Sequence, residues 1–294
     1  MSQGRGVELL LLGLLALLWG SSFAFIQVGV QGFPPVTLIG LRCAVAAAAL
    51  WLVLRLRGLS MPRDAMAWRD FAIQAALATV TPFVLIAWGS QQVPSALAVV
   101  LASTSPIFAF LLGFALRRLE QPDWRKGLGV LLGMGGVIGL VAHQGLSGGS
   151  LPHMLAIVFS GLLFAASGYT GLSHFRAKDP LLPALGAQSV GMLVLLPAGL
   201  ALERPWQLQP GPEHILALFG LALLCTALAS VIWFRLLRTL GVVATTSQAY
   251  LRVPIGAAIG VLLLGEAFPP AALAGTVLVM AGVWLMTRQR PGGG

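Results

Sequence analysis

Long stretches without a charged residue place the strongest constraint on this chain. Between Asp70 and Arg117 lie 46 uncharged residues, and between Lys126 and Arg176 lie 49. A helix needs about 20 apolar residues to cross a bilayer, so each stretch is long enough for two crossings. Charged residues make up 9% of the 294 residues, whereas soluble domains carry about 25%. The pattern excludes a soluble enzyme and indicates a helical membrane protein.

Helix breakers divide these stretches into single crossings. Pro34 and Pro35 interrupt a further stretch of 33 uncharged residues between Glu8 and Arg42. Residues 91–94 interrupt the stretch that follows Asp70, and the Gly/Ser-rich segment 143–152 interrupts the one that follows Lys126. The sequence therefore predicts an all-α membrane protein with ten transmembrane helices, near residues 8–28, 36–56, 69–90, 95–116, 124–142, 152–173, 181–201, 213–234, 242–264 and 268–287.

The basic residues indicate how the chain is oriented. With the amino terminus inside, 15 of the 18 Lys and Arg residues fall on inner segments, and the outer loops hold only Arg204. Cytoplasmic loops of membrane proteins carry such an excess, so both termini are predicted to be cytoplasmic. Topology thus explains the net charge of +9, and we expect no nucleic-acid partner.

The second half of the chain repeats the first. At an offset of 148, Ala96 matches Ala244 and Pro106 matches Pro254; at 146, Glu120 matches Glu266 and Arg42 matches Gln188. The repeat holds five helices, which divides the chain into units 1–146 and 147–294. An odd number of crossings inverts the second unit in the bilayer. Inverted repeats of this kind are typical of secondary transporters.

Several motifs are shared with a known family. They are WGSSF at 19–23, LIGLRCAVAAAAL around Arg42, and LRVPIGAAIGVLLLGE at 251–266, followed by Gly275 and Gly282. With them the chain resembles the drug/metabolite transporter superfamily, specifically its EamA-type ten-helix exporters. The resemblance implies a carrier of amino acids or related metabolites in a bacterial inner membrane, often working outward. One branch of this superfamily exports aromatic amino acids, and these motifs alone do not assign the chain to it.

Two arginines lie inside predicted helices, where a charge is costly. Arg252 is about ten residues into its helix, roughly 15 Å deep, beside Pro254. It either binds a substrate carboxylate or bonds to carbonyls freed by broken helices. Arg42 is shallower; it either binds substrate or has a packing role.

Polar and aromatic residues inside helices are further candidates. Clusters precede a proline in both halves: Ser103, Thr104 and Ser105, and Thr245, Thr246 and Gln248. Either they line the pathway, which we expect between helices 1, 3, 4, 6, 8 and 9, or they bond neighbouring helices. Trp19 with Ser21 and Ser22, and Tyr250 near Arg252, either stack on a substrate or pack in the core. The remaining lining candidates are Thr81, Trp88, Ser167, Gln188 and Ser230, with Gln74, Thr79 and Thr226 as weaker ones.

These features together predict a secondary transporter that exports small metabolites by alternating access between the inverted halves. Its simplest substrate is an amino acid with an apolar or aromatic side chain. A channel-like facilitator and a carrier of another small organic solute are the alternatives. Ser167 lacks a mid-membrane histidine partner, so we expect no enzyme. No cofactor or metal is expected, and the partners are substrate and lipid bilayer, with the chain a monomer or homodimer.

Overall fold

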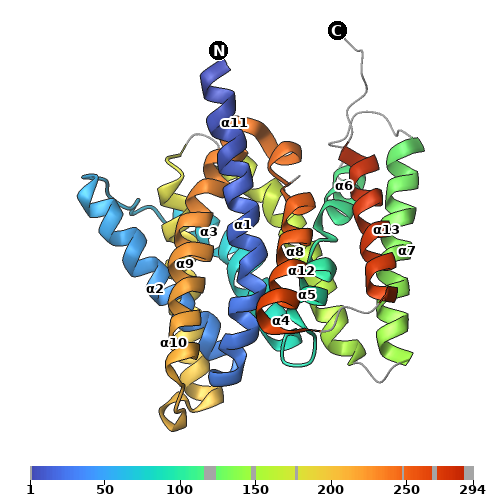
Figure 1. Ribbon diagram of the computed structural model, residues 1–294. Helices are drawn as coiled ribbons and strands as arrows, with labels where there is room; N and C mark the ends of the chain where they lie inside the picture. The colour runs from blue at the N-terminus through green and yellow to red at the C-terminus, as the bar shows by residue number, and fades with distance from the viewer. Residues whose placement is uncertain are drawn as a thin grey trace.

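The structure is a computed structural model that describes residues 2–115, 124–146, 150–175, 178–246, 248–266 and 270–287. Over these residues it is a bundle of helices (Figure 1). In chain order the elements are α1 (Ser2–Gly32), α2 (Pro35–Leu56), α3 (Ala65–Ala75), η1 (Ala76–Val80), α4 (Thr81–Gly89), α5 (Ser95–Ala102), α6 (Ser105–Ala115), α7 (Trp124–Leu146), α8 (Leu151–Phe175), α9 (Leu181–Glu203), η2 (Pro205–Gln207), α10 (Pro212–Phe219), η3 (Gly220–Leu228), α11 (Ala229–Thr246), α12 (Ala249–Leu264) and α13 (Pro270–Thr287).

The predicted all-α membrane architecture is confirmed. Within the described residues, seven helical segments are long and apolar enough to cross a membrane, and three shorter apolar helices occupy the remaining predicted positions. The shorter ones lie in α7, α12 and α13. The helix α13 ends at the same end of the bundle at which α1 begins (Figure 1), as an even number of crossings requires.

The helices pack in pairs that match between the two halves of the chain. Helix α2 runs along α9, and α7 runs along α13. Helix α1 packs against α12, and its counterpart α8 packs against α5 and α6. Exchanging the halves leaves this pattern unchanged, as expected for two copies of one five-helix unit. The boundary at residues 146 and 147 stays a prediction.

Small residues allow the paired helices to approach closely. A Cβ atom added to Gly136 of α7 would lie 2.7 Å from the carbonyl oxygen of Gly275 in α13. In the other pair, a Cβ atom on Gly191 of α9 would lie 2.9 Å from Sγ of Cys43 in α2. Both pairs therefore depend on glycine at their contact.

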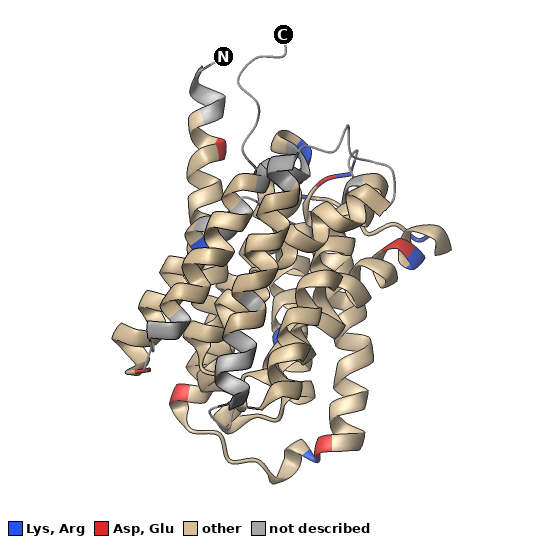
Figure 2. Cartoon of the chain, turned by 90° about the vertical axis from the view of Figure 1, so that its right-hand side faces the viewer, with Lys and Arg blue, Asp and Glu red and all other residues tan. Residues whose placement is uncertain are grey.

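Charged residues gather toward the ends of the bundle, and uncharged residues fill most of its length (Figure 2). We call the end where α1 begins and α2 ends the basic end. There Arg57 pairs with Asp179 at 3.2 Å, and Arg235 pairs with Glu8 at 2.9 Å. Each of these ion pairs joins the amino-terminal half of the chain to the carboxy-terminal half.

At the opposite end, two glutamates cap helix amino termini of the other half. The carboxylate of Glu203 accepts hydrogen bonds from the backbone N–H groups of Val36 (3.0 Å) and Thr37 (2.6 Å) at the start of α2. The carboxylate of Glu266 accepts from the N–H groups of Ser95 and Ala96, both at 2.8 Å. The first N–H groups of a helix lack internal partners and favour a negative charge. These carboxylates therefore fix the end of α9 to α2 and the end of α12 to α5.

The eighth predicted helix ends later than the sequence suggested. We expected it to end near residue 234, before Arg235 and Arg238, but α11 continues to Thr246. Both arginine side chains are exposed, and Arg235 bonds to Glu8, so the helix continues without burying their charges. As a result Thr245, which we predicted to lie in the ninth helix (242–264), lies in α11, and α12 begins at Ala249.

The orientation of the bundle in the membrane is a testable prediction. Single cysteines at the exposed positions Ser60 and Gln92 lie in the predicted inner and outer loops. We expect a membrane-impermeant maleimide added to intact cells to label Gln92→Cys and to leave Ser60→Cys unlabelled until the cells are opened. The native Cys43 and Cys225 are buried, so the unsubstituted protein provides the background. Labelling of Ser60→Cys from outside would reverse the orientation.

Candidate functional site

One cavity lies between the two halves, with an empty volume of about 420 Å³ that includes space open to solvent. Helices α1, α2, α3 and α4 with η1 supply one side, and α8, α9 and α11 with η3 supply the other. The lining residues are Trp19, Arg42, Gln74, Ala78, Thr79, Phe83, Phe164, Ala184, Ala187, Gln188, Cys225, Ser230, Trp233 and Phe234.

The cavity brings together some of the residues singled out from the sequence. Trp19, Arg42, Gln188 and Ser230 line it, as do the weaker candidates Gln74 and Thr79. The structure places the other described candidates outside the lining: Ser21, Ser22, Thr81, Trp88, Ser103, Thr104, Ser105, Ser167, Thr245, Gln248 and Arg252. The side chains of Thr246 and Tyr250 lie outside the described part of the structure.

The helices around the cavity differ from the expected set in one pair. The second and seventh crossings, α2 and α9, line it in place of the fourth and ninth. The physical reason is the packing order: α12 lies against α1, while α5 and α6 lie against α8. The fourth and ninth crossings therefore support the helices that form the walls.

Arg42 is the cation of the cavity lining and is 2% exposed. Its Nε donates a hydrogen bond to Oγ1 of Thr226, and its Cζ lies 3.5 Å from the centre of the Phe83 ring. Its Nη1 has no hydrogen-bond partner. No Asp or Glu is among the described lining residues. One face of this guanidinium is thus held by an aromatic ring, and one of its donors is left unpaired.

The partner of Arg42 sits in an irregular helix. The hydroxyl of Thr226 donates to the carbonyl oxygen of Leu221, five residues earlier, at 2.7 Å. This spacing is that of a π-helix, the form adopted by η3. The third crossing has its own π-helical segment, η1, which contributes Ala78 and Thr79 to the lining. Such segments are rare and often mark functional sites, and here one borders the cavity from each half.

Two glutamines add polar groups to the same cavity. Gln74 is 1% exposed and Gln188 is 3% exposed. The Oε1 of Gln74 accepts a hydrogen bond from the Thr170 hydroxyl at 3.2 Å, which leaves its Nε2 without a partner. The Oε1 of Gln188 is also without a partner. Buried polar groups are usually hydrogen-bonded, and three of the buried atoms without a partner belong to residues that line this cavity.

Aromatic rings form a continuous wall beside these polar groups. Phe83 contacts Phe164 with ring centres 5.6 Å apart, Phe164 contacts Trp19 at 5.9 Å, and Trp19 contacts Trp233 at 5.1 Å. We call these four residues the aromatic wall. Of these four, Trp19 was a candidate site residue predicted from the sequence. The two phenylalanines, Phe83 and Phe164, carry no such signal, because a phenylalanine in an apolar helix looks the same wherever it packs. The wall offers an apolar surface next to Arg42.

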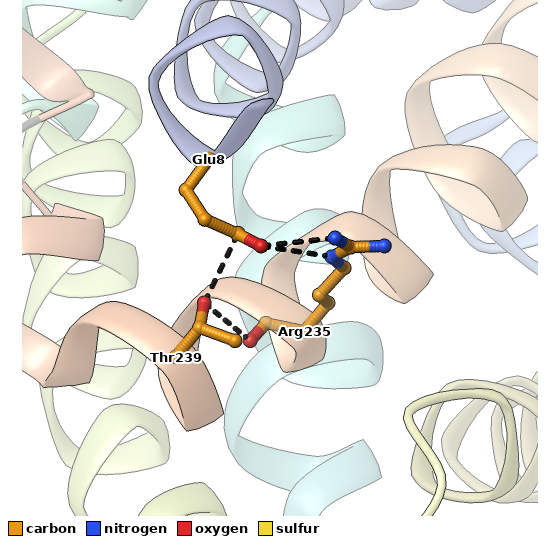
Figure 3. A network of polar contacts seen from close by, with 3 residues as sticks. All are labelled: Glu8, Arg235 and Thr239. Atoms are coloured by element: carbon orange, nitrogen blue, oxygen red, sulfur yellow. Dashed lines mark hydrogen bonds and ion pairs between the residues drawn. The ribbon is translucent and has the colours of Figure 1, made fainter. Parts of the chain in front are cut away.

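Toward the basic end, further rings close the cavity. Phe234 lines it and contacts Phe175 at 5.9 Å, and Phe175 stacks on Phe71 at 5.6 Å. Beyond them, Glu8 of α1 binds Arg235 and Thr239 of α11 (Figure 3). These are the two helices that supply Trp19 and Trp233. The network therefore fixes two walls of the cavity relative to each other.

Arg252 has a different environment, at the break between α5 and α6. Its Nη2 donates to Oγ of Ser103 at 2.9 Å and to the carbonyl oxygen of Ala102 at 3.3 Å. Ser103 and Thr104 in turn donate to the carbonyl oxygens of Val99 and Leu101. The geometry favours the structural alternative for this arginine, which joins α12 to the interrupted fourth crossing.

Other hydroxyls named from the sequence bond within their own helices. Ser21 donates to the carbonyl oxygen of Leu18, Ser22 to that of Trp19, and Ser167 to that of Phe164. Trp88 stacks on His153 with ring centres 4.0 Å apart, near the end opposite the basic end. These contacts account for the side chains without a ligand.

A multi-pass membrane protein with a polar and aromatic cavity between two matched halves has the architecture of a small-molecule carrier. Comparison with known proteins agrees with the architecture of a carrier. The model of the EamA-like transporter family matches the chain twice, over residues 7–142 and 152–288. The chain belongs to this family, whose fold has ten membrane helices. The family points to transport rather than catalysis.

Relatives extend over nearly the whole chain. A "Probable terminal-alkyne amino-acid exporter" of Streptantibioticus cattleyicolor is 30% identical and covers 93% of this chain and 91% of its own. A "Probable amino-acid metabolite efflux pump" of Salmonella typhimurium is 28% identical, with 93% of each chain covered. The "Uncharacterized inner membrane transporter YedA" of Escherichia coli is 27% identical over 86% of this chain and 81% of its own. A solved crystal structure with 19% identity has a TM-score of 0.66 over 94% of each chain, which shows the shared fold.

The structural role of Arg252 is testable by stability. Arg252→Met removes two buried hydrogen bonds from a charged donor, and we expect a loss of roughly 2–4 kcal/mol in the free energy of unfolding, seen as a lower melting temperature in detergent. Arg238→Met, at an exposed arginine of α11, is the matched control and should melt like the wild type. If Arg252→Met keeps the wild-type melting temperature but loses stabilisation by substrate, Arg252 binds substrate instead.

Proposed function

We propose that the protein is a secondary transporter that exports amino acids, or carboxylates derived from them, with apolar or aromatic side chains. The cavity is the substrate site, and Arg42 binds the substrate carboxylate. The observation that carries this proposal is the unpaired Nη1 of a buried arginine in a cavity without an acidic lining residue among those described. A buried charge without a counter-charge is costly, and an entering carboxylate offsets that cost.

The surroundings of Arg42 favour a carboxylate with an apolar side chain. Thr226 and Phe83 hold the guanidinium in one orientation, so its free donor is directed before substrate arrives. A charge-assisted bond from arginine to carboxylate is among the stronger hydrogen bonds. The aromatic wall beside it provides contacts for an aliphatic or aromatic side chain. The name of the relative from Streptantibioticus cattleyicolor, an exporter of terminal-alkyne amino acids, is consistent with such a substrate.

Alternating access is the transport mechanism that the matched halves support. The packing of the first crossing on the ninth has a counterpart in the packing of the sixth on the fourth, which favours two mirrored arrangements of the same helices at similar cost. A channel-like facilitator is the competing possibility. Counterflow separates the two, because only a carrier accelerates uptake of labelled substrate when unlabelled substrate fills the vesicle.

The role of Arg42 gives the decisive experiment. In proteoliposomes that contain the full chain, we expect counterflow of labelled phenylalanine or leucine that saturates with concentration. Arg42→Lys keeps the charge but loses the planar fork, and Arg42→Gln loses the charge. We expect the apparent affinity to fall about 10- to 100-fold in Arg42→Gln, the equivalent of a charged hydrogen bond, and by less in Arg42→Lys.

Arg238→Gln is the control, because its side chain is exposed at the basic end. Equal affinity in Arg42→Gln and wild type would refute the assignment of the carboxylate to Arg42. Uptake that is linear in concentration and shows no counterflow would refute the carrier mechanism.

A further inference from the structure

Arg42 and Gln188 occupy equivalent positions in the two halves, at the offset of 146 that relates α2 to α9. Both side chains are buried and both line the cavity. Because α2 and α9 are exchanged by the internal pseudo-symmetry, these two residues face the cavity from opposite halves. The two halves therefore contribute different charges to the site: one supplies a cation at this position and the other supplies an uncharged amide.

The charged pole of the site is Arg42. We propose that Gln188 and Gln74 form a second, uncharged pole that recognises an amide on the substrate. The preferred substrates are then N-acylated amino acids. This inference rests on the proposed function and narrows its substrate class. Each of the three unpaired atoms then has a partner. The carboxylate accepts from Nη1 of Arg42, the amide N–H donates to Oε1 of Gln188, and the acyl oxygen accepts from Nε2 of Gln74.

The charge of the site favours an N-acylated substrate over a free amino acid. The described lining holds the positive charge of Arg42 and no carboxylate. A substrate with one negative charge neutralises the site. A zwitterion also brings an ammonium group into the cavity, where Oε1 of Gln188 is the buried acceptor without a partner among the described lining residues. An ion removed from water needs a counter-charge or several hydrogen bonds, and the acyl group removes that requirement.

The aromatic wall does not replace the missing carboxylate. An ammonium group can bind the face of an aromatic ring, but one face of Phe83 is occupied by the guanidinium of Arg42. Trp19 packs against both Phe164 and Trp233, at interplanar angles of 70° and 41°. These rings are already engaged with one another, which suits them to hold an apolar side chain.

Three ligands that differ in one group separate the contributions. They are N-acetyl-phenylalanine, phenylalanine and 3-phenylpropanoate, and the last has the carboxylate and ring but neither amine nor amide. With the full chain purified in detergent, binding is measured by calorimetry at neutral pH. We expect N-acetyl-phenylalanine to bind at least tenfold more tightly than phenylalanine. Binding of phenylalanine that equals or exceeds that of N-acetyl-phenylalanine overturns the proposal and leaves the proposed function in place.

Substitutions at Gln188 test the second pole directly. Gln188→Met keeps the approximate shape of the side chain and removes the acceptor. We expect it to weaken the binding of N-acetyl-phenylalanine about tenfold and to change the affinity for 3-phenylpropanoate by less than twofold. Gln188→Glu supplies the missing counter-charge, so the preference should shift toward phenylalanine by tenfold or more. Gln91→Met and Gln91→Glu, at an exposed glutamine outside the cavity, are the matched controls and should bind all three ligands like the wild type.

The two proposals fail in different ways. If Gln188→Met weakens the binding of N-acetyl-phenylalanine and of 3-phenylpropanoate equally, Gln188 supports the cavity without contacting the amide. That result overturns this inference. An unchanged preference in Gln188→Glu, with the protein folded by its melting temperature, also overturns it. If none of the three carboxylates binds to the wild type, the proposed function falls as well.

Discussion

The buried guanidinium of Arg42 is the interaction on which the site depends. A cation in the interior of an apolar bundle is costly, and the fold reduces that cost without a carboxylate. It does so with the Thr226 hydroxyl on one nitrogen and the Phe83 ring against the guanidinium face. Thr226 reaches this position through the π-helical turn of η3, where its hydroxyl also bonds to Leu221. Arg42 lines the cavity and its Nη1 has no hydrogen-bond partner, and under the proposed function a ligand supplies that partner.

The membrane architecture was predictable because a bilayer acts on local composition. Charge-free runs, their breakers and the distribution of basic residues each depend on a short window of sequence, and the ten predicted crossings agree with the helices found. The end of the eighth crossing was not predictable in this way. Arg235 looks like a loop residue in the sequence, but it lies within α11, where its side chain pairs with Glu8, 227 residues away.

The candidate site was predictable only in part. The sequence gives the depth of a residue along its helix, but it does not give the side of the helix on which neighbouring helices pack. Arg252 and Arg42 are both buried arginines, and the sequence left a substrate-binding and a structural role open for each. The structure gives Arg252 partners from the fourth crossing, Ser103 and Ala102, and gives Arg42 a place in the cavity. The π-helical segments and the phenylalanines of the aromatic wall carried no signal, since both depend on what neighbouring helices bring to them.

The helices that carry Arg42 and Gln188 are also held together at both ends. At the basic end Arg57 of the α2 terminus pairs with Asp179, which itself accepts a hydrogen bond from the N–H of Leu181 in α9. At the other end Glu203 of α9 caps α2, and glycines bring the two helices close between these points. Alternating access requires other helices to move around a substrate whose contacts persist. A pair tied at both ends and tightly packed along its length is suited to stay fixed, which would keep the charged and uncharged poles at a constant separation while the entrances change.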